Sequence, residues 1–599
     1  MEPTNISQSS VARKQTILIC LVLFLFAFAV RTLTWQDDHR EAWKVQTSVT
    51  HRYQESARQL VNGEFKTFLT DVPRLGHPPG YPILLAAIAK TVGESDTVLQ
   101  FVQITVDAAA VVLLFLISLE LFSLSVSLVA GILAALSPQF AYFSILLLPD
   151  SLIVFPILLA VYLVIRSRNN FKFSRLLIAG ILIGLSCWLR ANAMLLPLFI
   201  GAAAALVSRR DKRVKALVTV VAGTIIAIAP ITIKNAIFFH HFIPLSLGSG
   251  QTLLEGIADY DPKGTLGIPG TDLGITRQEA QWYGKPEYAT QLFGEDGIER
   301  DRLRVRRALK TIADHPVWFA GVMGKRAIAS TRLDPVPVLK PESPVGPSHA
   351  NAEKVWTRTP EQWLNAERSS QTTVRSRPDA TGPLGVEVTG NNENRSDQIW
   401  TEAISISPYH DYSFVVPVKV EQGRVNLKIM AGDKELASTF GETNEVFDVN
   451  NQPIEKIDLE FVSTNNSQIR FVIANGASAQ STLLLGQAEL DDLGPSSMTW
   501  MRYLRIPLRL LQKFFTTAWA IPFLIVGTAL LVWRKHFVEL ALLMAVPAYY
   551  LMVQSALHTE RRYVYIIHFF FLVIVSFALC CGVNLLLEFV RRRRVKTAG

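Results

Sequence analysis

The sequence predicts an α-helical polytopic membrane protein of about ten transmembrane helices with an inserted extracytoplasmic β-sandwich domain. Three observations carry this prediction. Hydrophobic residues make up 50% of the chain and gather in uncharged runs of about 18 residues or more, the length that a membrane-spanning helix needs. Basic clusters flank these runs. A long polar region between them contains short runs of alternating β-branched residues, which favour strands.

The first apolar run, Thr16 to Leu33, is longer than the core of a signal peptide, which has about 7–15 residues. We therefore expect a retained first helix. The polar segment from Trp35 to Pro82 that follows is too long for a tight turn and has a helical pattern from Tyr53 to Leu60. This first loop, residues 34–82, carries several carboxylates beside the membrane, so we expect it to be an active-site element.

The next apolar run, Tyr81 to Val92, is too short to cross a hydrocarbon core of about 30 Å. We expect it to form an interfacial helix. The remaining apolar runs are long enough for spans or nearly so. They lie near residues 98–121, 125–147, 152–165, 176–189, 192–207, 216–238, 517–533, 537–557 and 564–590.

Four basic clusters test this topology. If the amino terminus is cytoplasmic and the 81–92 helix does not span, all four clusters fall on the cytoplasmic side, as the positive-inside rule requires. Counting that short helix as a span would place all of them outside. The basic residues behind the net charge of +9 thus indicate the orientation of the chain in the membrane. The first loop is expected on the extracytoplasmic face. The clusters are Arg166 to Arg175, Arg209 to Lys215, Arg534-Lys535 and Arg591 to Lys596.

The polar region between the spans is long enough to hold a domain. Residues 351–494 contain short strand-like runs at near-regular spacing, broken by turn signals, which is typical of a jelly-roll sandwich. We therefore expect three parts. A transmembrane catalytic module occupies residues 1–340, an extracytoplasmic β-sandwich residues 341–500, and the last membrane helices residues 501–599.

Three aspartates are candidates for catalysis. Asp37 and Asp38 follow the first helix at membrane-surface depth, where a carboxylate can act as a general base on an acceptor hydroxyl. The alternative is a solvated flank that stops the helix from sliding. Asp150 is expected on the same face, either as a second active-site carboxylate or as a helix N-cap.

Cations on the outer face are candidates for binding phosphate. The loop between the last two spans holds two adjacent arginines, Arg561 and Arg562, whose planar forks suit phosphate oxygens. Pairing with Glu560 or with lipid head groups is the alternative. Arg190 and Lys234 add cations at similar depth, either facing a cavity or snorkelling to the surface. The full set of donor-binding candidates is Arg190, Lys234, His558, Glu560, Arg561, Arg562 and Tyr563.

Several motifs together resemble those of the polytopic GT-C glycosyltransferases, which include protein mannosyltransferases and the aminoarabinose transferase acting on lipid A. Residues Gly76 to Ala86 have the sequence GHPPGYPILLA and, with the Tyr53 helix before them, are similar to the first-loop signature of that superfamily. The resemblance continues through Arg190-x-Asn192, Lys234-Asn235 and His558-x-Glu560-x-Arg562-Tyr563. The first-loop residues expected to contact substrate are Tyr53, His77 and Tyr81.

The resemblance implies a fold, a reaction and a location. It implies a GT-C-like enzyme of the bacterial cytoplasmic (inner) membrane that moves a sugar from a polyprenyl phosphate, undecaprenyl phosphate, to an extracytoplasmic lipid, glycan or protein acceptor, with inversion. In such enzymes an acidic residue just after the first helix is the base, which matches Asp37 or Asp38. Two departures stand out. The stretch EAWKVQTSVT separates this acid from the Tyr53 helix, and Lys234 replaces an arginine common among relatives.

We predict no cofactor. The activated donor is the lipid itself, and the sequence has no GxGxxG or P-loop pattern. Asp37-Asp38 is not a D-x-D motif, so no metal site is predicted, although some GT-C enzymes use a divalent metal. The expected partners are the lipid-linked sugar, the acceptor and membrane lipids, with no nucleic acid.

Two other classes stay open. A flippase or transporter of polyprenyl-linked sugars would show an internal repeat and paired broken helices with acidic residues near the bilayer midplane. The sequence shows no repeat, and its spans carry few charges except at their ends. A membrane-anchored glycan-binding protein would use the sandwich, whose segment Ile406 to Tyr412 resembles carbohydrate-binding modules. Trp356, Trp363 and Trp400 would then be stacking platforms, with packing in the core or a linker as the alternative for each.

Overall fold

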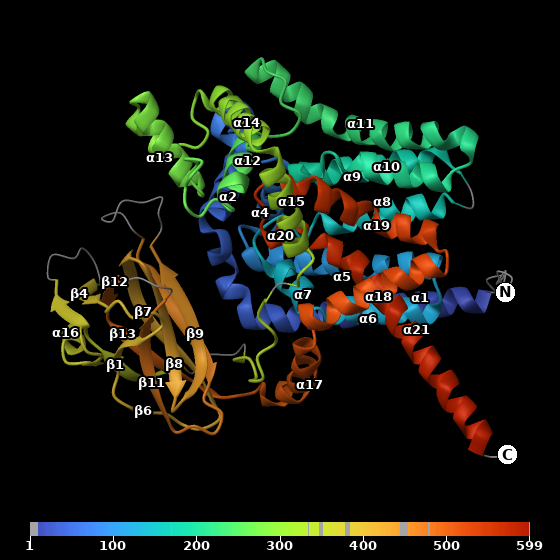
Figure 1. Cartoon of the computed structure of the whole chain (residues 1–599). Coiled ribbons are helices and arrows are strands. Elements are labelled where there is room, and N and C mark those ends of the chain that lie inside the picture. The colour runs from blue at the N-terminus through green and yellow to red at the C-terminus, as the bar shows by residue number, and fades with distance from the viewer. Residues whose placement is uncertain are drawn as a thin grey trace. The chain divides into compact units, whose positions relative to one another are not determined.

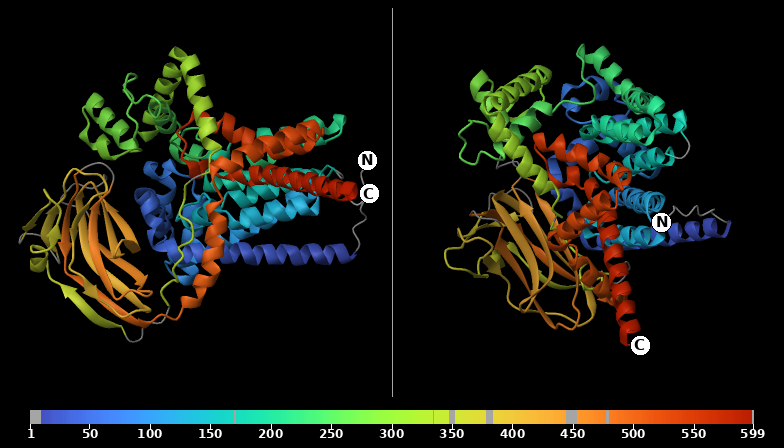
Figure 2. Two further views of the ribbon diagram at one scale, coloured as in Figure 1. Left: turned by 60° about the horizontal axis from the view of Figure 1, so that its bottom comes forward. Right: turned by 45° about the vertical axis from the view of Figure 1, so that its right-hand side comes forward.

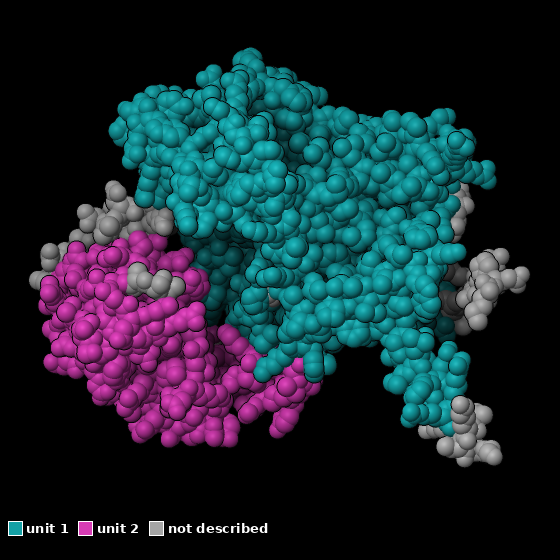
Figure 3. Space-filling model, viewed as in Figure 1, with its two compact units in different colours: residues 1–338, 511–599 teal, residues 339–510 magenta. Residues whose placement is uncertain are grey.

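The computed structural model describes residues 10–168, 171–333, 335–346, 352–377, 384–443, 453–476 and 480–597. The chain folds into two compact units (Figure 3). The first, Met1–Val338 with Leu511–Gly599, is helical in its described part, and the second, Leu339–Leu510, is mainly β. The predicted combination of a helical membrane region and a β-sheet domain is therefore confirmed.

The helical unit is built on apolar helices that run side by side (Figures 1 and 2). Among the described residues, five helices are long and apolar enough to cross a membrane, or seven if each of two bent pairs is one span. Four shorter apolar helices, α4, α8, α9 and the η3–α10 segment, accompany them. The bundle helices are α1 (Ser10–Asp38), α5 (Asp96–Leu121), α6 (Leu124–Leu136), α7 (Pro138–Ile145), α8 (Val154–Arg166), α9 (Phe173–Leu189), α10 (Leu196–Val207), α11 (Arg213–Phe239), α18 (Thr517–Trp533), α19 (Phe537–Met552) and α21 (Ile566–Thr597).

The first loop and the region after α11 fold into shorter helices at one end of the bundle (Figure 1). The helix that we expect at the interface is α4, which has 13 residues. The shorter elements of this unit are η1 (His39–Gln46), α2 (Thr47–Val61), α3 (Phe65–Thr70), η2 (Val72–Gly76), α4 (Gly80–Val92), η3 (Ala191–Ala193), η4 (Arg210–Lys212), α12 (Ser249–Ala258), α13 (Asp272–Tyr283), η5 (Pro286–Thr290), α14 (Gly297–Asp314), α15 (Pro316–Ser330), η8 (Gln554–Ala556) and α20 (Arg561–Val564).

A buried ion pair supports the break between α6 and α7. The two helices bend by 50° at Ser137, so the last carbonyls of α6 lack intrahelical donors. Arg31 of α1, fully buried, donates to the carbonyl oxygens of Ala134 and Ala135 at 3.4 and 3.2 Å. Its Nε lies 2.5 Å from the carboxylate of Asp107 on α5, which is equally buried. The guanidinium thus replaces the missing helical partners, and the carboxylate neutralises it.

Helices α9 and α11 approach each other closely because three glycines lie between them. A Cβ placed on Gly180 would stand 2.1 Å from the carbonyl oxygen of Val220, and one on Gly223 would stand 2.4 Å from that of Leu177. Gly184 meets α11 as tightly one turn further along. Small residues at this spacing let membrane helices pack backbone against backbone.

The β unit consists of two antiparallel sheets around one core (Figure 1). One sheet has the order β1-β13-β7-β12-β4-β3 with β10 beside β7, and the other has the order β2-β5-β11-β8-β9 with β6 beside β11. Phe414 and Phe471, one from each sheet, stack at 4.4 Å between ring centroids. Trp363 is fully buried in this core and donates to the carbonyl of Gly486, so it cannot be a sugar-stacking platform.

Several strands of this unit alternate between buried and more exposed side chains, as half-buried strands do. The elements are β1 (Glu353–Arg358), α16 (Pro360–Trp363), β2 (Glu367–Arg368), β3 (Thr373–Ser376), β4 (Leu384–Thr389), β5 (Asp397–Trp400), β6 (Ile404–Ser405), β7 (His410–Gln422), β8 (Arg424–Ala431), β9 (Lys434–Glu442), β10 (Glu455–Val462), β11 (Gln468–Asn475), β12 (Thr482–Gly486), β13 (Ala488–Pro495), η7 (Thr499–Met501) and α17 (Arg502–Lys513).

Candidate functional site

Two glutamines of α5 hold the irregular segment that carries Asp150. Gln100 Nε2 donates to the carbonyl oxygen of Ile145 at 2.8 Å, and Gln103 Nε2 donates to that of Leu146 at 2.6 Å. Both acceptors lie where α7 ends and leaves carbonyls without intrahelical donors. The segment after α7 is thereby fixed. Helix α8 begins at Val154 without a side-chain cap, so the alternative of Asp150 as an N-cap is wrong.

Asp150 instead pairs with Arg190, which follows α9. Arg190 Nη1 lies 3.2 Å from Asp150 Oδ2, and the guanidinium stacks 4.2 Å from the ring centroid of Tyr563. Asp150 is 2% exposed, and its Oδ1 has no hydrogen-bond partner within the described chain. Burial raises the pKa of Asp150, while Arg190 and Arg562 oppose the rise. The carboxylate therefore holds the Arg190 guanidinium in place and keeps one oxygen available.

The loop before α21 brings a second guanidinium to the same place. Arg562 is 5% exposed, and its Nη2 donates to Glu560 Oε1 at 2.8 Å. Its Nη1 is buried and has no acceptor among the described residues. Burial alone would raise the pKa of Glu560, but Arg562 holds that pKa below its usual range. Tyr563 OH also donates to Glu560, at 3.0 Å. The cluster of Asp150, Arg190, Glu560, Arg562 and Tyr563 thus offers an unused N–H donor at a buried cation.

The turn after Asp37 and Asp38 leads toward this cluster. Both aspartates are half-buried at the end of α1, which continues to Asp38. The backbone carbonyl of His39 accepts from Gln100, at 3.5 Å, the same side chain that holds the end of α7. At the far end of η1, Gln46 Nε2 donates to Glu560 at 3.4 Å. The η1 segment is therefore bonded at its start to the glutamine that holds the end of α7 and at its end to Glu560 of the cluster.

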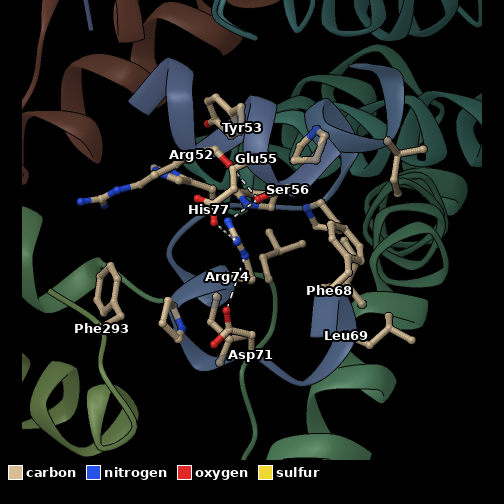
Figure 4. A pocket seen from close by; sticks show the side chains of 18 of the residues that line it. Arg52, Tyr53, Glu55, Ser56, Phe68, Leu69, Asp71, Arg74, His77 and Phe293 are labelled. Atoms are coloured by element: carbon tan, nitrogen blue, oxygen red, sulfur yellow. Dashed lines mark hydrogen bonds and ion pairs between the residues drawn. The ribbon is translucent and has the colours of Figure 1, made fainter. Parts of the chain in front are cut away.

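A cavity of about 600 Å³ is lined in part by residues of the first loop (Figure 4). Its walls are mainly apolar, with aromatic, leucine, isoleucine and proline side chains from the first loop, α9, α11 and the segment after η5. Lys234 lines it, and its Nζ lies 3.4 Å from the carbonyl oxygen of Leu69. Tyr53 and His77 line it as well, with ring centroids 5.0 Å apart. A cavity of this size with apolar walls and one polar, charged wall suits an amphipathic ligand.

Arg74 organises the polar wall of the cavity (Figure 4). Its Nη1 donates to Ser56 Oγ at 2.9 Å and its Nη2 lies 3.0 Å from Glu55 Oε1, both on α2. Its Nε lies 3.5 Å from the carboxylate of Asp71. Burial raises the pKa of Asp71, and Arg74 opposes this effect. Arg52 completes the set, so the wall has cations and carboxylates side by side.

The pKa of His77 depends first on its burial and then on the cations near it. Burial, followed by the nearby Arg190, Arg52 and Arg562, lowers the pKa of His77 to about 3. The imidazole is therefore neutral at physiological pH and can exchange hydrogen bonds with a ligand without adding charge. Arg190 and Arg562 act on His77 although they do not themselves line the cavity. The chain itself places the cluster next to the cavity, because Trp188, two residues before Arg190, lines the cavity.

We predict that His77 makes the protein less stable in acid. Its pKa in the unfolded chain is near 6.5 and its folded pKa is about 3, so the unfolded state binds more protons between these values. The free energy of unfolding should fall as the pH drops below about 6.5. A His77→Gln variant should lose less stability between pH about 7 and about 5 than the wild type, as measured by thermal unfolding in detergent. The exposed His51→Gln is the control, and equal pH dependence in all three proteins would contradict the prediction.

The structure brings most of the sequence-predicted residues into this site. The cluster holds Asp150, Arg190, Glu560, Arg562 and Tyr563. The cavity wall holds Tyr53, His77 and Lys234. Tyr81 is fully buried, with its ring centroid 5.0 Å from that of Tyr53, and donates to Gln103 at 3.1 Å.

Two residues of the loop before α21 lie elsewhere. Arg561 lines a separate cavity of about 250 Å³. His558 bonds to Asp259, with 2.9 Å between Nδ1 and Oδ2, and lines neither cavity. Neither residue lines the cavity of about 600 Å³, and their part in donor binding stays a prediction.

Arg52 and Arg74 of the cavity wall were not among the candidate site residues, and Asp71 was noted only as one of the carboxylates of the first loop. Their signal was their place in the first loop, where charged residues alternate with apolar ones. Treating that loop as one polar segment hid which of its charges face the cavity. The side chain of Asn192, which donates to the carbonyl of Tyr563 at 3.4 Å, was visible only as part of a motif.

The fold and the site define a class. A multi-pass bundle of apolar helices with an amphipathic cavity beside buried guanidinium groups is suited to an integral membrane enzyme acting on an anionic lipid. Comparison with known proteins gives one family match. Residues 76–233 match the family model described as dolichyl-phosphate-mannose-protein mannosyltransferase. The predicted GT-C resemblance is thereby confirmed.

Two solved structures also match, both weakly. Modules of xylanase 10B from Clostridium thermocellum, complexed with xylohexaose, align with 23% of this chain and 28% of that chain at 11% identity and a TM-score of 0.18. Arabinosyltransferase EmbB from Mycobacterium smegmatis aligns with 75% of this chain and 65% of that chain at 10% identity and a TM-score of 0.20. The chain thus spans less than two thirds of either structure, and we infer nothing from likenesses this weak. No curated protein matches the sequence.

Proposed function

We propose that the protein transfers a sugar from a polyprenyl phosphate to an extracytoplasmic acceptor, by a single displacement with inversion. The acceptor hydroxyl attacks the anomeric carbon, a first-loop aspartate takes its proton, and the bond between that carbon and the phosphate oxygen breaks. The lipid phosphate leaves with the electron pair of that bond. Asp37 and Asp38 are the candidate bases, and the cluster receives the phosphate.

The observation that carries this proposal is the pair of guanidinium groups of Arg190 and Arg562 next to a cavity with mainly apolar walls. Arg190 and Arg562 lie within range to depress the pKa of His77, which lines that cavity. Arg562 has a buried N–H donor that no described residue uses. An isoprenoid chain fits the apolar walls, and the departing phosphate would meet donors that are already in place. Lys234 offers a further cation on the cavity wall.

The topology proposed with it has ten spans, which are α1, α5, the bent pair α6–α7, α8 to α11, α18, α19 and α21. Helix α1 begins and α21 ends at the same end of the bundle (Figures 1 and 2), which favours an even number of crossings. The basic clusters then favour that end in the cytoplasm and the site outside it. The catalytic module is residues 1–340 with 501–599, and the sandwich, residues 341–500, is extracytoplasmic.

Asp37 and Asp38 are favoured as bases because the η1 segment that follows them is held by hydrogen bonds at both of its ends. His39 and Gln46 bracket the η1 segment, one bonded to Gln100 and the other to Glu560. Asp150 is less suited to proton abstraction, since its carboxylate already pairs with Arg190. We assign Asp150 the role of fixing that guanidinium.

The test is transfer of radiolabelled sugar from a panel of undecaprenyl-phosphate sugars in membranes that contain the protein. We expect Asp37→Asn or Asp38→Asn to lower transfer by about 100-fold or more, the usual contribution of a general base. The two variants are matched to each other, because the residues are adjacent and both half-buried. Asp71→Asn is a further comparison, since Asp71 is the first-loop aspartate that lines the cavity.

The outcomes separate the alternatives. Loss of transfer in one of the first two variants, with normal insertion and yield, supports that residue as the base. Loss in Asp71→Asn alone would move the base to the cavity wall. Transfer indifferent to all three changes would refute a first-loop base, and labelled lipid that crosses the bilayer without transfer would indicate a flippase.

A further inference from the structure

Helix α17 has its apolar side exposed. Tyr503 is 82% exposed, Leu510 is 55% exposed and Phe514, just after the helix, is 69% exposed. Ile506 lies between them, so these positions recur every three or four residues and occupy one face of the helix. The other large exposed apolar residues in and around the helix are Trp500, Leu504 and Leu511. A helix surrounded by water would normally bury such a face.

The polar side of α17 packs against the protein instead. Arg505 is fully buried, and its Nη1 donates to the carbonyl oxygen of Lys340 at 3.5 Å. Arg509 Nη1 donates to the carbonyl oxygen of Leu339 at 2.5 Å. The usual amphipathic arrangement is therefore inverted, with Arg505 and Arg509 packed inward and the apolar side chains outward. This inversion is expected where the surroundings of the helix are lipid.

The chain places α17 beside the membrane. Only Phe514 to Thr516 separate it from α18, and three residues reach at most about 11 Å. Helix α18 is a continuous apolar segment that we assign as a span. Helix α17 itself cannot continue that span, because it carries four cations in 12 residues. An exposed apolar face tethered this close to a bilayer is within reach of the acyl chains.

We propose that α17 is an interfacial anchor that lies in the plane of the membrane. Its Tyr503, Leu510 and Phe514 face enters the boundary between head groups and acyl chains of the leaflet where α18 begins. Arg502 and Lys513, both exposed, meet anionic lipid head groups. The occupant of this surface is thus the lipid leaflet, and the proposal does not depend on which sugar is transferred.

The test measures the surroundings of single side chains in the full-length protein. Nitroxide labels are attached at Tyr503→Cys, Leu510→Cys and Lys513→Cys in a background where the four native cysteines are alanine. The labelled proteins are placed in nanodiscs of phosphatidylglycerol and phosphatidylcholine. Collision rates with oxygen, which concentrates in the bilayer, and with a water-soluble nickel complex are compared. The native cysteines are Cys20, Cys187, Cys580 and Cys581.

Two positions serve as controls. Lys513 lies on the same helix at the edge of the apolar face, where the proposal places the head groups. Asp433→Cys, in the exposed turn between β8 and β9, reports full contact with water.

We expect the ratio of oxygen to nickel collisions to be several-fold higher at positions 503 and 510 than at positions 513 and 433. Frequent nickel collisions at both apolar positions would show that they face water and would overturn the proposal. Few collisions with either reagent would show that protein covers the face, either a second copy or another chain, and would overturn it as well. Replacing Arg502 by glutamine should reduce the ratio in anionic nanodiscs only.

Discussion

Replacing Arg562 by glutamine is expected to lower sugar transfer by a factor of about 100 or more. The guanidinium is 5% exposed and pairs with Glu560, and it has an N–H donor that no described residue uses. A preorganised donor in a buried site stabilises developing phosphate charge far better than water does. Glutamine keeps much of the side-chain size but removes the charge. The measurement is kcat/KM with the lipid-phosphate sugar.

Two further variants make this experiment decisive. Arg562→Lys keeps the charge but loses the planar fork, so we expect its activity to fall between those of the wild type and the glutamine variant. Arg302→Gln, an exposed arginine on α14, is the control for the loss of a positive charge. Each protein is first shown to be monodisperse and to unfold at a similar temperature. Full activity of Arg562→Gln in such a preparation would exclude a role in transition-state binding.

Replacing Asp107 by leucine is expected to destabilise the helical unit by about 3–5 kcal/mol. Asp107 and Arg31 are both fully buried, with 2.5 Å between their nearest atoms. Removing the carboxylate leaves the charge of Arg31 without a counter-ion in an apolar bundle, and that is the costly state. The change should appear as a lower midpoint of denaturant-induced unfolding in mild detergent.

The double variant Arg31→Met with Asp107→Leu distinguishes the cost of an unpaired charge from the cost of altered packing. It removes both charges, so we expect it to recover a large part of the loss seen in the single variant. Recovery should be incomplete, because the carbonyls of Ala134 and Ala135 lose their donor. Equal loss in the single and double variants would contradict the argument from the unpaired charge.

Local sequence patterns were sufficient to predict many of the helices. The span expected at residues 216–238 is α11, which runs from Arg213 to Phe239, and the short helix expected at 81–92 is α4. Hydrophobic runs are continuous signals, so length and composition reveal them. The run at 125–147 is different, because it is broken between α6 and α7. Ser137-Pro138 was the available sign, since proline at the first position of a helix ends the one before it.

The candidate site could be predicted only in part from the sequence. Its arginines could be predicted because positive charge is unusual in an outside loop. Their partners were not, because Asp150 and Arg190 are separated by 40 residues, and Gln46 and Glu560 by 514. Such pairs depend on how helices pack, and no local periodicity encodes that. Core packing was one of the two alternatives for Trp363, and the sequence could not decide between them, since the neighbours of Trp363 come from distant strands.

The close approach of α9 and α11 determines the distance between two cations of the candidate site. The contact is backbone against backbone, so no side chain at Gly180 or Gly223 can rotate to make room. Arg190 follows α9 and Lys234 belongs to α11, so the distance between these two cations is set where the helices touch. Two glycines therefore set the spacing of groups that neither of them contacts. A methyl group added at either position would push the two helices apart and would change the distance between Arg190 and Lys234.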